Sequence, residues 1–108
     1  LMLRERLGDR LGIVECAGSL ATLAVRDGDV RTALRLFGFA SAMREVLGTP
    51  VHPSEQPEQE RWMTEARSGV DPAQADTWWQ QGRALTLTQA IEEARAFANP
   101  VPPRTPDA

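Results

Sequence analysis

The sequence contains no lysine, and this absence excludes a large class of nucleotide-binding sites. All twelve basic residues are arginine, whereas a phosphate-binding P-loop requires a lysine after its glycine-rich turn. The net charge of −3 gives the chain no electrostatic footprint for nucleic acid. Acidic residues alternate with the arginines near the start, which indicates a solvated helix face. We therefore expect no direct nucleic-acid contact from this segment.

Cysteine and histidine are almost absent, which leaves few residues for catalysis or metal binding. Cys16 stands alone and lies near an apolar helix face, so we expect a reduced, buried thiol in a cytoplasmic protein. His52 is the only histidine, and no second histidine or cysteine lies at ligand spacing. The acidic residues at expected helix starts complement the helix dipole; they are Glu55, Glu58, Glu60, Glu92 and Glu93. The prediction is a protein that is not an enzyme, with no catalytic residue, metal or cofactor.

Long apolar runs are also missing. No stretch approaches the roughly 18 apolar residues of a membrane span, and no charged-then-apolar signal sequence is present. The sequence predicts no membrane partner and a cytoplasmic location.

Apolar residues recur at helical spacing on both sides of a turn at Gly28 and Asp29. The face before the turn consists of Ile13, Ala17, Leu20, Ala21 and Ala24. Two stripes follow the turn: Val30, Ala33, Leu34, Phe37 and Ala40, and then Leu36, Phe39, Met43 and Val46 or Leu47. Because a surface helix has one apolar face, we expect the second helix to lie between neighbours. Residues 9–47 are predicted to form an antiparallel helix pair, with Gly28 ending one helix and Asp29 capping the next.

The segments on either side complete a helical domain over residues 1–98. Residues 1–7 are read as the tail of an upstream helix, ended by Gly8, with Asp9 capping the next. Three capping helices are expected in 54–98. The first is capped by Ser54 and buries Trp62, Met63 and Ala66; the second starts at Asp71, ends near Gln81 and buries Ala75, Trp78 and Trp79. The third starts with a capping box at 86–89 and has one apolar stripe: Leu87, Ala90, Ile91, Ala94, Phe97 and Ala98. Residues 99–108 are rich in proline and are predicted to be a disordered tail or linker.

The helix pair resembles a tetratricopeptide repeat, whose length of about 34 residues it matches. The signature positions are those of Leu20, Ala21 and Ala24 on the first helix and of Ala33, Phe37 and Ala40 on the second. The resemblance implies an all-α fold of antiparallel helix pairs, a fragment of a right-handed α-solenoid with about five helices. Such repeats stack on neighbours, which implies upstream repeats or improvised caps.

Two further segments are similar to the C-terminal helical-repeat region of large bacterial ATP-dependent transcriptional regulators, including LuxR-type ones. One is 36–50, with a Leu-Phe-Gly step and an Arg-Glu-Val-Leu-Gly-Thr-Pro ending. The other is 79–90, with a tryptophan, a Gly-Arg pair and a Leu-Thr-Leu step before the last helix. In these regulators a nucleotide-binding module and a DNA-binding domain lie elsewhere in the chain.

The resemblance implies a non-catalytic protein-interaction or signal-relay scaffold. Its partners would be proteins: neighbouring repeats or domains of the parent chain, or a second copy of this segment. It also implies a partner-binding concave face on the first helix, formed by Glu15, Gly18, Thr22, Val25 and Arg26. Alternatively, these residues form a solvated helix side. A second hypothesis is a small-molecule effector sensor, favoured by any pocket that Trp78 or Trp79 lines together with polar groups.

Overall fold

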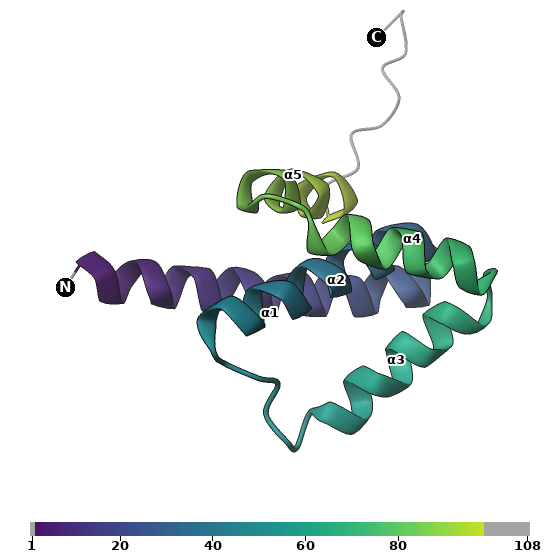
Figure 1. Cartoon of the computed structure of the whole chain (residues 1–108), viewed down its shortest axis with the longest axis horizontal. Helices are drawn as coiled ribbons and strands as arrows, with labels where there is room; N and C mark the ends of the chain where they lie inside the picture. The colour runs from purple at the N-terminus through teal and green to yellow at the C-terminus, as the bar shows by residue number, and fades with distance from the viewer. Residues whose placement is uncertain (1, 99–108) are drawn as a thin grey trace, which may run out of the picture.

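The computed structural model describes residues 2–98, which form five α-helices (Figure 1). The helices are α1 (Met2–Asp27), α2 (Val30–Leu47), α3 (Gln56–Ser68), α4 (Pro72–Arg83) and α5 (Leu87–Ala98). No strand occurs in this part of the chain, so the all-α prediction is confirmed. None of the described helices is long and apolar enough to cross a membrane. The tail predicted at 99–108 lies outside the described residues.

The first helix is longer than the sequence pattern predicted. Gly8 and Asp9 do not separate two helices, because α1 continues through both without a break. A glycine ends a helix when its backbone turns left-handed, whereas one glycine that keeps helical angles costs only about 1 kcal/mol relative to alanine. The positive φ angles in residues 2–98 belong to Gly28 and Gly48 alone.

The turn between α1 and α2 has the predicted caps. Gly28 adopts a φ of 87°, and the Asp29 carboxylate accepts a hydrogen bond from the backbone N–H of Thr32 at 3.2 Å. At the other end of α2, Gly48 is left-handed with a φ of 67°. The N–H of Thr49 then donates to the carbonyl of Arg44 at 3.1 Å. Both ends of α2 are therefore fixed by local sequence.

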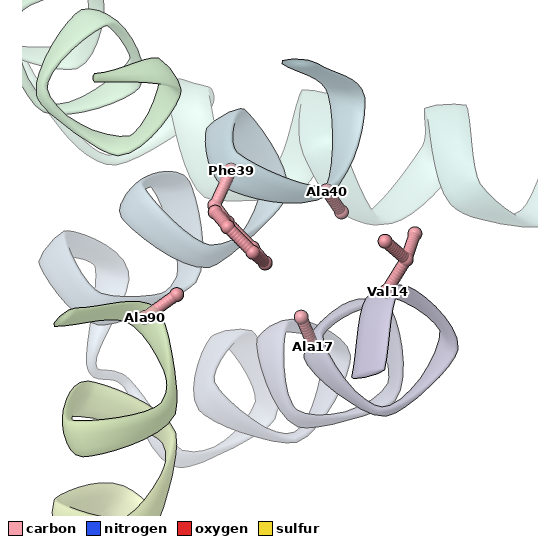
Figure 2. Close-up of a cluster of buried hydrophobic side chains, with 5 residues drawn as sticks. All are labelled: Val14, Ala17, Phe39, Ala40 and Ala90. Carbon is pink, nitrogen blue, oxygen red and sulfur yellow. The ribbon is translucent and has the colours of Figure 1, made fainter. Parts of the chain in front are cut away.

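Helix α2 lies at the centre of the molecule and contacts each of the other four helices. Both of its predicted apolar stripes are buried: Ala33, Leu34, Phe37 and Ala40 on one, and Leu36 and Phe39 on the other. Figure 2 shows Phe39 directed between α1 and α5, near Ala17 and Ala90. Beyond these residues the second stripe continues through Leu47, which packs against the core, and not through Val46, which is 76% exposed.

Helices α2 and α4 cross with their backbones in contact. A Cβ at Gly82 would overlap the carbonyl group of Arg35, and a Cβ at Gly38 would overlap the carbonyl oxygen of Trp79. Gly82 was expected to end α4 after Gln81, but it lies inside the helix and is buried. The expectation was wrong because Gly82 serves close helix packing and leaves the backbone helical.

The two remaining helices differ in how they dock. Thr86 and Gln89 form the predicted capping box of α5, with hydrogen bonds of 2.9 and 3.1 Å. The N-cap of α3 is Glu55 and not Ser54, because the N–H of Glu55 already donates to the carbonyl of His52 in a turn. Figure 1 shows α3 diverging from α1 and α2 toward its own N-terminus. Its last turns dock through Ala66, which is fully buried.

Candidate functional site

The divergence of α3 leaves a groove between α1 and α3, floored by the end of α2. We call it the α1–α3 groove; its volume is about 610 Å³. Its walls include Glu15, Gly18 and Thr22 on α1, Arg44 on α2, and Glu58 and Trp62 on α3. Val14 and Ala40 form a buried apolar floor. A groove of this kind can bind a ligand that is partly polar and partly apolar.

Three of the five residues predicted for a concave face line this groove together. Glu15, Gly18 and Thr22 follow one another along α1 and face α3 across the groove. Val25 does not join them, because it packs against the core around Leu34 and Leu36. Arg26 lies beyond the groove wall, with its guanidinium carbon 6.0 Å from the centre of the Trp62 ring.

The opposite wall and the floor were not predicted as site residues. Trp62 was expected to be buried in the core, but it is only half-buried and lines the groove. Arg44 belongs to α2, and its Nη1 donates to the carbonyl of Thr49 at 3.2 Å. Nothing in the local pattern distinguishes Arg44 from a basic residue that complements the end of a helix dipole. Its position in the groove follows from the path of α3.

A second cavity lies on the other side of α3, bounded by α2 and α4. We call it the α2–α3–α4 pocket; its volume is about 530 Å³. Phe37, Met63 and Trp79 form apolar walls, and Arg44, Glu45 and Glu60 add charge. Trp78 and Trp79 were expected to be buried, but both are half-buried because α3 does not close over α4. The Trp79 ring is also covered by Arg67, whose guanidinium carbon lies 5.5 Å from the ring centre.

Two ion pairs join α2 to α4 and to α5. Arg83 on α4 contacts Glu45 on α2 at 2.6 Å, and this bond lowers the pKa of Glu45. Arg35 on α2 binds Glu93 on α5 through two bonds of 2.8 and 2.7 Å, which raise the pKa of Arg35. Arg35 also donates to Gln81 on α4 at 2.6 Å. These pairs fix α4 and α5 against α2.

Cys16 is exposed, contrary to the expected buried thiol. It borders a smaller apolar groove of about 200 Å³ between α1 and α5, together with Leu20 and Ile91. The helix turns Ala17 and Val14 toward the core instead, and both are almost fully buried. The prediction failed because adjacent positions on a helix point about 100° apart, so a residue beside the apolar stripe can face solvent.

In the described residues, the other side chains considered for catalysis or metal binding do not come together in a site. His52 Nδ1 lies 2.8 Å from the hydroxyl of Ser54, but both side chains are exposed on the loop before α3. The same nitrogen accepts the backbone N–H of Ser54 at 3.2 Å, so the contact shapes this loop. Within residues 2–98, no three histidine, cysteine, aspartate or glutamate residues are grouped in a way that could hold a metal ion.

Comparison of the chain with protein-family models, with curated proteins and with solved structures found no match. The function must therefore be argued from the geometry of the site itself.

Proposed function

We propose that this chain is a non-catalytic protein-interaction or signal-relay scaffold, in which the α1–α3 groove receives a segment of a partner protein. The observation that carries the proposal is the groove itself. Side chains from three helices converge there, while the α2 core beside it is filled by fully buried residues such as Leu34 and Leu36. Because this core is filled, the protein can hold a ligand in the groove without rearranging its core.

The arrangement of α1 and α2 supports a tetratricopeptide-like interpretation. Next to the turn, Val25 and Val30 pack against the same cluster around Leu34. Far from the turn, Val14 of α1 and Ala40 of α2 belong to one buried cluster, against which Met43 packs. We therefore interpret α1 and α2 as an antiparallel pair, with α3 as the first helix of a following unit in a solenoid.

We further propose that the parent protein is a cytoplasmic bacterial transcriptional regulator. This step rests on the similarity of residues 36–50 and 79–90 to the helical-repeat region of such regulators. In that setting the groove would contact a protein segment from the same regulator or from its signalling partner. Binding of that segment would then affect the rest of the regulator through the central helix α2.

Gly18→Phe tests whether the groove binds protein segments. A Cβ at Gly18 meets no atom within 4 Å, so the substitution fills the groove without disturbing the fold. Peptides selected from a displayed random library against the native chain should lose at least tenfold in affinity for the variant. Gly12→Phe is the matched control, because Gly12 is an equally open glycine of α1 outside the groove. Equal binding by both variants and the native chain would refute the proposal.

A small-molecule sensor is the second candidate, and one observation favours it. The α2–α3–α4 pocket is lined by Trp79 and by the charged Arg44 and Glu60, which is the arrangement expected for an effector site. Gly18 does not line this pocket. A small molecule that quenches tryptophan fluorescence equally in the native chain and in Gly18→Phe would therefore support the sensor.

A further inference from the structure

The α1–α3 groove is acidic at one end, and two arginines lie beyond the other. Glu15 on α1 faces the start of α3, where Glu55 and Glu58 line the same groove. Beyond the other end, the guanidinium carbons of Arg26 and Arg61 lie 6.0 and 5.6 Å from the centre of the ring of Trp62, which lines the groove. All five charged residues are exposed. A ligand that extends from the acidic end past Trp62 therefore meets carboxylates at one end and guanidinium groups at the other.

Two buried hydrogen-bond donors lie between these ends. Within the described part of the chain, Nε of Arg44 and Nε1 of Trp62 are buried and have no hydrogen-bond partner. Both residues line the groove. A buried donor without an acceptor lowers stability, by about 1–3 kcal/mol for a neutral group and by more for a charged one. A ligand acceptor can remove that penalty if the Arg44 and Trp62 side chains turn these nitrogens toward the groove, and backbone carbonyl groups are acceptors.

The length of the groove limits the length and the conformation of the ligand. The distance along α1 from Glu15 to Arg26 is about 16 Å, because a helix rises about 1.5 Å per residue. An extended chain rises about 3.3 Å per residue, so about five residues span it. The walls offer Gly18, where an approaching backbone meets no side chain, and the small hydroxyl side chains of Ser19 and Thr22. An extended peptide fits these dimensions better than a helix about 10 Å wide.

We propose that the α1–α3 groove binds an extended segment of about five residues with a basic side chain at one end and an acidic side chain at the other. The basic side chain lies at Glu15, Glu55 and Glu58, and the acidic one lies near Arg26 and Arg61. Backbone carbonyls in the middle accept hydrogen bonds from Arg44 and Trp62. This inference rests on the proposed function and adds the charge pattern of the partner. Because the charges are exposed, they contribute more to selectivity than to affinity.

Three capped, fluorescein-labelled pentapeptides with the same Val-Thr-Val centre test the charge pattern. The first carries arginine at one end and glutamate at the other, the second arginine at both ends, and the third glutamate at both ends. Fluorescence anisotropy at low salt should show the first peptide binding at least fivefold more tightly than either of the others. The preference should shrink at high salt, because exposed charges are screened. Equal affinities, or a preference for a peptide with one sign of charge, would overturn the proposal.

The second part of the test reverses charges on the protein. Glu15→Arg combined with Glu58→Arg should transfer the preference to the peptide with glutamate at both ends. Glu92→Arg is the control, because Glu92 is exposed on α5, away from the groove. Trp62→Phe keeps an aromatic ring but removes the indole N–H. It should lower the affinity for the mixed-charge peptide about three- to tenfold. An unchanged preference after double reversal would contradict the inference.

The two proposals fail in different ways. If library-selected peptides bind the native chain, lose affinity for Gly18→Phe and show no charge preference, the groove is a protein-binding site without the proposed polarity. If Gly18→Phe binds them as the native chain does, the groove is not the binding site and both proposals fail.

Discussion

At the residue scale, the packing of α4 on α2 depends on Gly82 and Gly38, whose side chains are single hydrogen atoms. Each glycine lies where the backbones of α2 and α4 touch, so neither position has room for a methyl group. Gly12 and Gly18 of α1 have open space beside them. Gly12, Gly18 and Gly38 look alike in the sequence, as glycines within helical segments, and only the contacts separate Gly38 from the other two.

Gly82→Ala should lower the free energy of unfolding by about 1–3 kcal/mol, because the added methyl forces α4 away from the carbonyl group of Arg35. Chemical denaturation monitored by tryptophan fluorescence measures the change. Gly12→Ala is the control and should raise stability by up to about 1 kcal/mol, since alanine favours a helix and nothing opposes it. A stabilising effect at both positions would mean that the helices do not cross here.

At the scale of elements, the helices differ in what holds them. Local caps define both ends of α2 and the start of α5. Helix α5 then docks on α1 and α2 through Ala90, which packs near Ala17 and Phe39 in Figure 2. Its other attachment is the pair of hydrogen bonds between Glu93 and Arg35. The side chains of this pair are only 25% and 15% exposed.

Glu93→Gln should destabilise the docking of α5 by about 1–2 kcal/mol, between the values for exposed and fully buried ion pairs. The reason is that the guanidinium of Arg35 loses a charged partner with two acceptor oxygens. Hydrogen exchange should become faster in α5 than in α1. The neighbouring Glu92→Gln changes an exposed residue and should alter stability by less than about 0.5 kcal/mol. Equal effects of the two substitutions would show that the ion pair does not hold α5.

At the scale of the whole molecule, α2 is the element on which every other helix depends. Phe37 is among its largest fully buried side chains, and it packs with Ala21 of α1 and Leu36, against which Trp62 and Trp79 also pack. Both cavities described above are built on this core, because residues of α2 form part of their walls.

Phe37→Ala should therefore lower the free energy of unfolding by about 3–5 kcal/mol, as large-to-small core substitutions do. Urea unfolding followed by circular dichroism measures the loss across all helices at once. Val46→Ala, at a 76% exposed position of the same helix, should change stability by less than about 0.5 kcal/mol. A loss below about 1 kcal/mol for Phe37→Ala would show that the packing register of α2 is wrong.

The fold was predictable where local chemistry and periodicity agree. The two stripes of α2 identified it as a central helix, and Gly28, Asp29 and the capping box of Thr86 marked helix ends. Prediction failed where the outcome depends on a distant segment. Gly8 resembled a helix stop, Gly82 a helix end, and Cys16 a core residue, but the structure places none of them in these roles.

The candidate site was half-predictable. Glu15, Gly18 and Thr22 are spaced three or four residues apart and share a face of α1, and the resemblance to a tetratricopeptide repeat marked that face as a partner-binding one. Their partners Arg44 and Trp62 come from other helices. No local spacing relates these two residues to α1.

The sequence by itself determined which segments become helices, where most of them are capped, and which face of each is apolar. Backbone hydrogen bonding and side-chain periodicity are local properties, and they act before any two helices meet. The tertiary structure decided the rest: that α4 touches the backbone of α2 at two glycines, and that α3 stands away from α1 and α2 at its N-terminal end. That divergence depends on packing between segments far apart in the chain, and it creates the groove in which the unpaired donors of Arg44 and Trp62 lie.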